Sequence, residues 1–460
     1  MALIKSISGI RGTIGGKPGE SLSPVDIVKF AAAFGTWVQR RHNKAGLKVI
    51  VGRDARKSGS MVNNLVITTL RSLGINVTDL GMATTPTVEL AVTGKHADGG
   101  IIITASHNPA EWNALKLLNE TGEFLSSGDG MDVLEIAVSE DFNFVSNDLT
   151  GSLEFDDSWG QKHIDLILNL KLVDVEAIKA SGFKVAIDCI NSVGGIILPQ
   201  LLKALGVDKI FEINTTPDGN FAHNPEPLPE NLKSISELVI REKADIGFVV
   251  DPDVDRLAIV CEDGSMFGEE YTLVSVSDYI LKNSPGNTVS NLSSTRALKD
   301  ITVKYGCYHF SSEVGEVNVV AEMKKRGAVI GGEGNGGVIY PELHYGRDAL
   351  VGIALFLSHL AKNKMKCSDL RKQYPSYIIA KKKLTLSPAT EFSQIISAVK
   401  SHFKENLTDE RDGLWIEYKT GWVQIRKSNT EPIMRIYAEG PTNKDAMELA
   451  DMVIGIVNKL

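Results

Sequence analysis

Short apolar runs alternate with helix-like segments in the first part of the chain, and this alternation is the main constraint on its fold. Leu47–Val51 and Asn76–Leu80 have the length and composition of strands, and Met61–Leu73 between them has helical periodicity. Ile101–Thr104 is the next strand-like run. A strand–helix–strand order of this kind predicts a doubly wound α/β domain.

The alternation restarts twice after a polar stretch at Glu140–Ser158, and it changes character near Tyr374. From there, strand-like runs that alternate in polarity are flanked by two amphipathic helical segments, which indicates an α+β module. We therefore predict an α/β protein with three similar α/β domains, each built on a mixed sheet, and a C-terminal α+β domain. The expected boundaries are 1–150, 151–257, 258–373 and 374–460.

Composition narrows the functional class. A chain of 460 residues is too long for one core. Its net charge of −8 argues against nucleic acid as a partner, because phosphate backbones require a basic face. The four cysteines are scattered and no apolar run of membrane-spanning length occurs. We expect a cytoplasmic protein with reduced thiols, no structural zinc and no membrane partner; the N-terminus lacks the apolar segment of a signal peptide.

A serine follows the apolar run Ile101–Ile103, in the sequence Thr-Ala-Ser-His-Asn-Pro. A hydroxyl on a loop at the end of a strand is well placed to act as a nucleophile or phosphate carrier, so Ser106 is the first candidate. His107 beside it is expected to position Ser106 and not to act as its base. Read alone, the loop also fits an ordinary turn.

Three carboxylates at alternate positions follow another buried-strand run: Asp251, Asp253 and Asp255, with Arg256 after them. Ligands of open α/β sheets bind at the carboxyl ends of strands. Three like charges repel unless a hard cation neutralises them, and Mg²⁺ prefers such oxygen ligands. An EF-hand is excluded because Arg256 stands where its loop requires glycine.

A glycine-rich segment, residues 331–337, contains Glu333 and Asn335, which could bind two neighbouring sugar hydroxyls. A glycine-rich turn without function is the alternative. A second polar segment between two strand-like runs concentrates cations, hydroxyls and an amide, which suits a phosphate dianion. It comprises Arg426, Ser428, Asn429 and Thr430, with Arg435 beyond it.

Four single residues complete the candidates. Arg11 and Arg53 both follow apolar runs and could face a phosphate, or could form structural ion pairs. Lys116 would be a general base if burial depressed its pKa. His344 is a candidate for acid/base work, with a structural role as the alternative.

Taken in order, the four motifs resemble those of the α-D-phosphohexomutase superfamily, which includes phosphoglucomutase, phosphomannomutase and phosphoglucosamine mutase. The resemblance covers the whole chain, and the serine and aspartate motifs are its most specific parts. It implies four domains around a central cleft, a phosphoryl group carried by Ser106, and Mg²⁺ held by Asp251, Asp253 and Asp255 together with that group. It also implies that Glu333 and Asn335 bind the sugar and that the segment from Arg426 to Arg435 binds its phosphate.

Two loops depart from the sequence of many members of the superfamily. The sugar-binding loop often reads Gly-Glu-x-Ser-Gly-His, and here Asn335 replaces the serine and Gly337 the histidine. Any acid/base role of that histidine must therefore move, with Lys116 and His344 as candidates. The phosphate-binding loop has Asn429 where many members have glycine. Both loops resemble those of a prokaryotic subgroup often called phosphoglucosamine mutase.

The expected activity is reversible transfer of a phosphoryl group between the 6- and 1-positions of a hexose phosphate, through a hexose 1,6-bisphosphate that also serves as activator. Phosphoryl transfer depends largely on positioning and charge stabilisation, which suits a cation, three carboxylates and Arg256. Glucosamine phosphate is the first expectation for the sugar, with mannose and glucose phosphates as alternatives. More distant alternatives are a serine-dependent metal phosphatase and a non-catalytic phosphosugar-binding protein. Monomer and homodimer both remain open.

Overall fold

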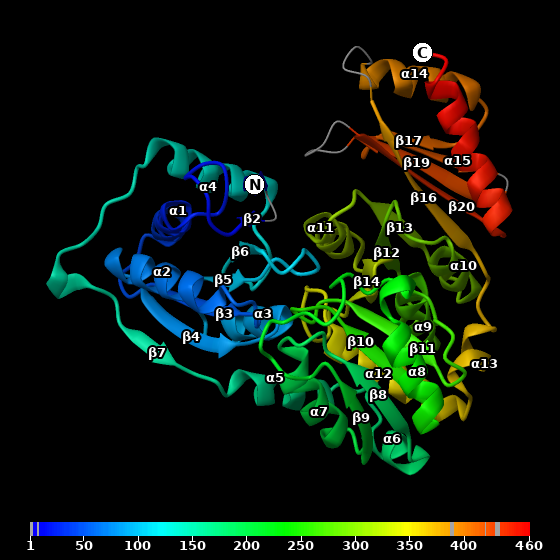
Figure 1. Cartoon of the computed structure of the whole chain (residues 1–460), viewed down its shortest axis with the longest axis horizontal. Helices are drawn as coiled ribbons and strands as arrows, with labels where there is room; N and C mark the ends of the chain where they lie inside the picture. The colour runs from blue at the N-terminus through cyan, green and yellow to red at the C-terminus, as the bar shows by residue number, and fades with distance from the viewer. Residues whose placement is uncertain (1–2, 7–8, 387–390, 419, 428–432) are drawn as a thin grey trace. The chain divides into compact units, whose positions relative to one another are not determined.

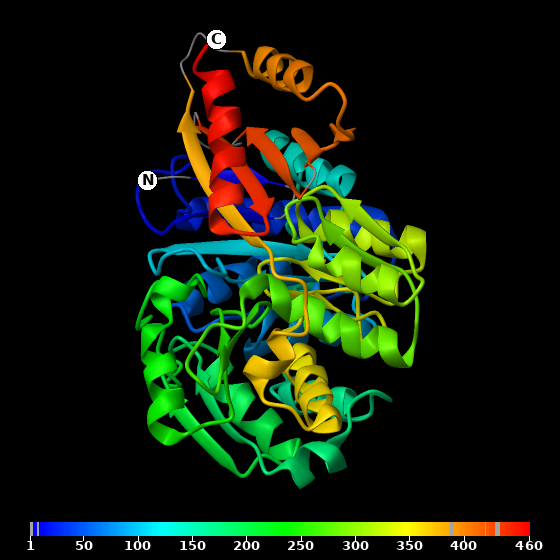
Figure 2. The same cartoon turned by 90° about the vertical axis from the view of Figure 1, so that its right-hand side faces the viewer.

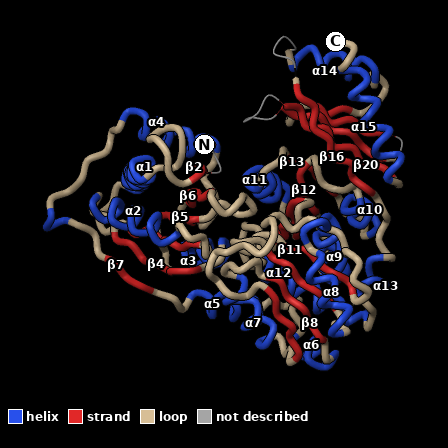
Figure 3. The backbone as a smooth tube through the Cα atoms, in the orientation of Figure 1, coloured by secondary structure: helices blue, strands red, loops and turns tan. Residues whose placement is uncertain are grey.

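The computed structural model describes residues 3–6, 9–386, 391–418, 420–427 and 433–460, which form two compact units. The first unit comprises Met1–Thr272 and Gly336–Leu370, and the second comprises Leu273–Asn335 and Arg371–Leu460. Figures 1 and 3 show the alternation of helices and strands within each unit. No described helix is long and apolar enough to cross a membrane.

The first sheet has seven strands in the order β1-β2-β6-β5-β3-β4-β7. Strands β5, β3, β4 and β7 run parallel, whereas β6, β2 and β1 add antiparallel pairs at one edge. The strands are β1 Leu3–Ser6, β2 Gly9–Thr13, β3 Lys48–Arg53, β4 Asn76–Met82, β5 Gly99–Ile103, β6 Trp112–Leu118 and β7 Leu153–Phe155. The helices are α1 Pro24–His42, α2 Gly59–Ser72, α3 Thr85–Gly94 and α4 Ser127–Ser139.

The isoleucine run of β5 shows why this sheet is covered on both faces. Ile101 and Ile103 belong to the core formed with α1, α2 and α4, whereas Ile102 belongs to a separate core with α3. Side chains of a strand alternate between faces, so three consecutive apolar residues require cover on both sides. The β5–β6 loop therefore leaves a fixed strand end.

The second sheet has the order β11-β10-β8-β9, with β10 parallel to β8 and antiparallel to β11. Its strands are β8 Lys184–Asp188, β9 Lys209–Ile213, β10 Ile246–Val250 and β11 Leu257–Cys261. Helices α5 Trp159–Leu168, α6 Val175–Ser181, α7 Gly194–Ala204 and α8 Lys233–Glu242 belong to the same part of the chain. Short 3₁₀ turns occur at Asn147–Leu149 and Pro229–Asn231. The first unit also contains β15 Gly337–Ile339 and α12 Ala349–Asn363.

In the second unit, β12 pairs in parallel with both β13 and β14. These strands are Thr288–Asn291, His309–Ser312 and Ile330–Glu333, accompanied by α10 Ala297–Lys304 and α11 Glu316–Arg326. Helices α9 Glu269–Asn283 and α13 Cys367–Arg371 lie where the chain passes between the units.

The C-terminal sheet is antiparallel throughout, in the order β16-β20-β19-β18-β17. Helix α15 packs along β16 and β20, as Figure 2 shows, and shares one core with α14 and the sheet. The elements are β16 Ile378–Thr385, α14 Phe392–His402, β17 Thr408–Asp409, β18 Leu414–Tyr418, β19 Gly421–Lys427, β20 Ile433–Gly440 and α15 Asn443–Val457. The predicted fold class, three α/β parts with mixed sheets and an α+β part, is confirmed. The exact boundaries of the four domains stay a prediction.

Candidate functional site

Ser106 lies on the loop between β5 and β6 and is buried in a strained backbone conformation. Its φ of +47° is in the left-handed region, which residues with a side chain seldom adopt. Its amide donates to Thr104 Oγ1 at 2.9 Å, and its Oγ donates to Asp251 Oδ2 at 2.7 Å. The structure therefore joins the serine loop to the acidic loop, 145 residues away in the sequence.

His107 Nδ1 lies 3.4 Å from Ser106 Oγ. Burial, together with the charges of Arg256 and Arg347, lowers the pKa of His107 to about 2. A neutral imidazole with this pKa is a poor proton acceptor near neutral pH. Its position supports the expected positioning role.

A buried arginine that the sequence did not single out holds the serine loop in place. Arg56 forms an ion pair with Asp54 at 3.0 Å, and both side chains are fully buried. Asp54 in turn accepts from Thr104 Oγ1 at 2.7 Å. The Arg56 guanidinium donates to three carbonyls of the loop, those of Ser106, Asn108 and Pro109, and to the carbonyl of Trp112 at the start of β6. Five polar contacts to one guanidinium account for the fixed path of the loop.

Asp251, Asp253 and Asp255 follow β10, and each is completely buried. One oxygen from each lies within 4.8 Å of the others. Val254 between them has a φ of +63°, an unusual conformation for a β-branched residue. Asp251 Oδ1 accepts from the amides of Asp255 and Arg256 at 3.2 and 3.1 Å, which fixes the turn.

The three carboxylates suit a hard divalent cation. Asp253 Oδ1 and Asp255 Oδ1 are buried and have no hydrogen-bond partner. Burial, followed by the charges of Asp255 and Asp253, raises the pKa of Asp251 well above its usual range. Buried carboxylate oxygens without a partner are costly, and Mg²⁺ takes ligands of this kind. The donor set therefore fits the magnesium site that the sequence predicts.

Two positively charged side chains offset the negative charge of this cluster and bind the carboxylate oxygens that accept hydrogen bonds. Lys116 on β6 donates to Asp253 Oδ2 at 2.7 Å and lies 3.5 Å from Asp255 Oδ2. Arg347 donates to Asp255 Oδ2 at 2.6 Å. Thr85, at the start of α3, donates to Asp253 Oδ2 at 2.6 Å. Neither Arg347 nor Thr85 is among the residues predicted from the sequence.

The condition under which Lys116 would be a general base, a pKa lowered by burial, is not met. Burial alone would lower it, but attraction to Asp253 and Asp255 outweighs burial and raises the pKa above its ordinary value. A lysine in this state is a fixed positive charge and cannot accept a proton at neutral pH.

His344 belongs to a buried charged network and does not contact Ser106. Its Nδ1 lies 3.2 Å from Glu89, and its Nε2 lies 3.3 Å from Asp348, which also contacts His163 at 2.9 Å. Burial alone would lower the pKa of His344, but the hydrogen bonds to Asp348 and Glu89 raise it to about 10. These contacts favour the structural alternative.

The two remaining arginines of the first unit differ in placement. Burial, followed by repulsion from Arg256, lowers the pKa of Arg11, so Arg11 lies near the acidic loop. Arg256 itself is buried and lies 3.8 Å from Asp255 Oδ1. Arg53 instead donates to the carbonyl of Asp54.

In the second unit, the predicted sugar-binding residues lie at the end of β14. Glu333 Oε1 accepts from Asn291 Nδ2 at 2.8 Å and from the amide of Gly315 at 3.1 Å. Asn335 Nδ2 lies 3.4 Å from Glu333 Oε2. The two predicted side chains are therefore adjacent, with the carboxylate of Glu333 oriented by its neighbours.

Arg426 and Arg435 face one another across β19 and β20 in the same register. Arg426 Nε donates to Asp412 Oδ1 at 2.7 Å, and Arg435 Nε is buried without a partner. Two opposed like charges are unfavourable in a sheet unless a counter-charge binds them. Ser428, Asn429 and Thr430 lie outside the described residues.

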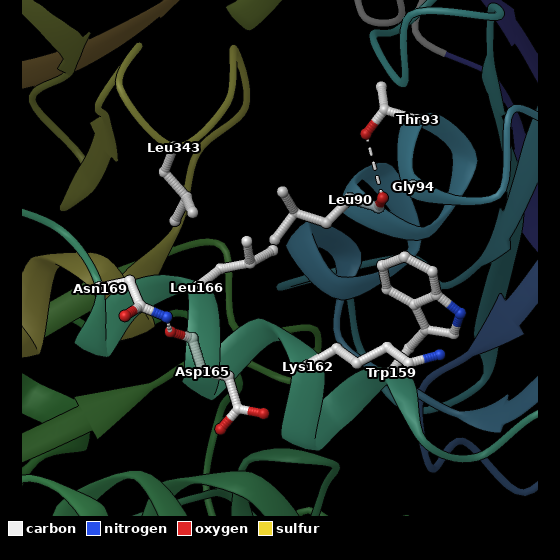
Figure 4. A pocket seen from close by; sticks show the side chains of 9 residues that line it. All are labelled: Leu90, Thr93, Gly94, Trp159, Lys162, Asp165, Leu166, Asn169 and Leu343. Carbon is white, nitrogen blue, oxygen red and sulfur yellow. Dashed lines mark hydrogen bonds between the residues drawn. The ribbon is translucent and has the colours of Figure 1, made fainter.

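A separate hollow of about 540 Å³ lies between α3 and α5 of the first unit, as Figure 4 shows. Leucines, Trp159 and Lys162 line it, with Leu343 on the opposite side. The described part of its lining includes none of the predicted site residues.

Four family models match consecutive parts of the chain, and all four describe domains of phosphoglucomutase/phosphomannomutase. They are alpha/beta/alpha domain I at residues 3–144, domain II at 161–264, domain III at 268–377 and the C-terminal domain at 382–456.

Individual relatives are similar in sequence to this chain over nearly their full length. A phosphoglucomutase/phosphomannomutase of Thermococcus kodakarensis is 36% identical, over 97% of this chain and 98% of its own. A probable phosphoglucosamine mutase of Methanopyrus kandleri is 31% identical, over 98% and 97%. The crystal structure of a phosphoglucomutase/phosphomannomutase family protein from Burkholderia thailandensis superposes with a TM-score of 0.85 at 27% identity, over 99% of this chain and 97% of that one. The chain belongs to the phosphoglucomutase/phosphomannomutase family of the α-D-phosphohexomutase superfamily.

Proposed function

We propose that the protein is a phosphohexomutase that interconverts hexose 6-phosphate and hexose 1-phosphate, with Ser106 as the phosphoryl carrier. The observation that carries this proposal is the contact between Ser106 Oγ and Asp251 Oδ2 at 2.7 Å, beside two buried carboxylate oxygens without partners. A serine hydroxyl placed at a cation site suits phosphoryl transfer.

The reaction would begin with Ser106 phosphorylated. The bond from phosphorus to Ser106 Oγ breaks as a bond from phosphorus to the oxygen of a sugar hydroxyl forms, the proton of that hydroxyl ends on Ser106 Oγ, and a hexose 1,6-bisphosphate results. The reverse step, with the other phosphoryl group of the bisphosphate, restores phosphoserine and releases the isomer. Mg²⁺ held by Asp251, Asp253 and Asp255 would stabilise negative charge on the phosphoryl oxygens.

The surrounding residues would orient the group and balance its charge. Arg56 fixes the loop, while Lys116 and Arg347 hold the outer oxygens of Asp253 and Asp255. Oriented charges that need no rearrangement during the reaction are the main source of catalysis in phosphoryl transfer. Glu333 and Asn335 would bind sugar hydroxyls, and Arg426 and Arg435 the phosphate that is not transferred.

For the sugar, we propose glucosamine phosphate, supported by the relatives named as probable phosphoglucosamine mutases. Formation of glucosamine 1-phosphate would serve the synthesis of UDP-N-acetylglucosamine. Glucose and mannose phosphates are the alternatives, because the 36% identical relative carries both names.

One set of coupled assays tests this proposal. Glucosamine, glucose and mannose 6-phosphates are compared with and without a hexose 1,6-bisphosphate, and release of inorganic phosphate is followed in parallel. Isomerisation stimulated by the bisphosphate, with the highest kcat/KM for glucosamine 6-phosphate, is the expected result. Phosphate release without isomerisation would instead identify a phosphatase, and binding without either reaction a phosphosugar-binding protein.

A further inference from the structure

Asp412, on the turn between β17 and β18, binds two different parts of the second unit with its two carboxylate oxygens. Its Oδ1 accepts from Arg426 Nε at 2.7 Å, and its Oδ2 accepts from the amide of Val314 at 3.0 Å. The side chains of Asp412 and Arg426 are largely buried, with 17% and 23% exposure. A carboxylate is the only side chain that can accept through both oxygens in this way.

The contact at Val314 continues directly to Glu333. Val314 and Gly315 connect β13 to α11, and the Gly315 amide donates to Glu333 Oε1 at 3.1 Å. Gly315 has a φ of +115°, which a residue with a side chain rarely adopts. Three successive contacts therefore join the Arg426 guanidinium to the Glu333 carboxylate.

A second connection ties the same turn to the end of β12. The Asp412 carbonyl accepts from Gln424 Nε2 at 3.0 Å, and Gln424 Oε1 accepts from Ser293 Oγ at 2.6 Å. Gln424 is almost fully buried, and Asn291, two residues before Ser293, also binds Glu333. The turn is thus fixed against both loops that orient Glu333.

We infer that Asp412 is a positioning residue that sets the separation between Arg426, which would bind phosphate, and Glu333, which would bind sugar hydroxyls. This inference rests on the proposed function, which assigns the binding roles of those two side chains. A fixed distance between these two side chains selects phosphosugars whose phosphate and hydroxyls are separated by a matching distance. Hexose 6-phosphates are therefore favoured over pentose 5-phosphates, whose chains are one carbon shorter.

The test compares Asp412→Asn with wild type and with the control Asp451→Asn, which removes an exposed carboxylate of α15 that pairs with Lys382 on β16. The asparagine amide presents N–H groups to one of two donors, so one of the two contacts must fail. We expect kcat/KM for the hexose 6-phosphate to fall about tenfold or more, and that for a pentose 5-phosphate to change much less. Asp412→Ser, which is smaller and admits water, provides a second variant should the first not fold.

A binding measurement makes the inference independent of turnover. Inorganic phosphate is added to each protein, and hydrogen exchange is followed in the peptide that contains residues 313–316. Phosphate should slow exchange of this peptide in wild type and Asp451→Asn, but not in Asp412→Asn or Asp412→Ser. Equal protection in all proteins, or none in wild type, would overturn the inference.

The two readouts separate the possible failures. Absence of hexose phosphate turnover in wild type, with the exchange result as expected, would refute the proposed function and leave the coupling through Asp412 in place. Normal turnover with unchanged discrimination between hexose and pentose phosphates in Asp412→Asn would refute the positioning role alone.

Discussion

At the scale of single residues, two positions of the proposed reactive centre have a strained backbone. Ser106 and Val254 both adopt left-handed conformations, each of which costs about 1–2 kcal/mol for a residue with a side chain. Such strain persists only where the surroundings impose it and is common at active sites. Here Arg56 imposes it on the serine loop, and the amide contacts to Asp251 impose it on the acidic loop.

Ser106→Ala should abolish mutase turnover and leave the fold intact, because the methyl group fits where the hydroxyl lies but cannot carry phosphate. Coupled assays and circular dichroism measure the two effects. Substantial residual isomerisation would remove Ser106 from the carrier role.

Arg56→Ala should destabilise the protein strongly, by about 3–5 kcal/mol, because it leaves the buried Asp54 carboxylate without its cationic partner. Arg56→Lys should retain part of the stability and still lose most activity, since an ammonium cannot reach four carbonyls and a carboxylate together. Denaturant unfolding and kcat are the measurements. A lysine variant with normal kcat would show that Arg56 does not position the loop.

Chelation of divalent cations should abolish turnover, and added Mg²⁺ should restore it. Mg²⁺ should also raise the melting temperature of the wild-type protein, because a ligand that binds only the folded state stabilises it. Asp253→Asn should lose this stabilisation, whereas Asp369→Asn, outside the acidic loop, should retain it. Equal stabilisation of both variants would place the cation elsewhere.

At the scale of elements, the sequence predicts where reactive loops leave the strands but not the residues that hold them. The strand ends at Ile103 and Val250 follow from apolar runs bounded by polar residues, so Ser106 and the three aspartates could be found directly. Arg56 and Arg347 could not, because the Ser106 carbonyl and the Asp255 carboxylate that they bind are 50 and 92 residues away. Nothing in local periodicity indicates which distant loops will meet.

The charge state of Lys116 also could not be predicted from the local sequence. Its position ten residues after Ser106 can be read from the sequence. The sign of its pKa shift, however, depends on Asp253 and Asp255, which only the tertiary fold brings beside it. The sequence could supply the candidate and not its charge state. Of the predicted phosphate-binding residues, Arg426 and Arg435 lie together as neighbouring strands require.

The segment from His344 to Asp348 acts as one element that supports the acidic loop. Its ends bind Glu89 and His163, and Arg347 between them reaches Asp255. Asp348→Asn should lower the melting temperature and reduce kcat together, because it weakens the anchor next to Arg347 and leaves two histidines with a single buried carboxylate. A stable variant with unchanged kcat would separate this network from catalysis.

At the scale of the whole molecule, one buried carboxylate, that of Glu439, should make the stability of the second unit depend on pH. Glu439 on β20 accepts from the Arg296 amide, which connects the C-terminal sheet to the start of α10. Burial raises the pKa of Glu439 to about 7, although its hydrogen bonds oppose the shift. Because the folded state favours the protonated acid, its contribution to stability is complete below the unfolded pKa and is lost as pH rises through 7.

Stability of the second unit should therefore decline between about pH 4.5 and 7 in the wild-type protein, relative to Glu439→Gln, which stays neutral throughout. Melting curves across this range, compared between the two proteins, give the difference directly. Parallel pH profiles would show that Glu439 ionises with an ordinary pKa.

The carrier role of Ser106 is tested most directly by mass spectrometry of the protein after incubation with a hexose 1,6-bisphosphate and then with hexose 6-phosphate. The first step should place a phosphoryl group on Ser106, and the second should remove it with formation of bisphosphate. Phosphate on another residue, or loss from Ser106 to water at the same rate without the sugar, would contradict the proposed mutase mechanism.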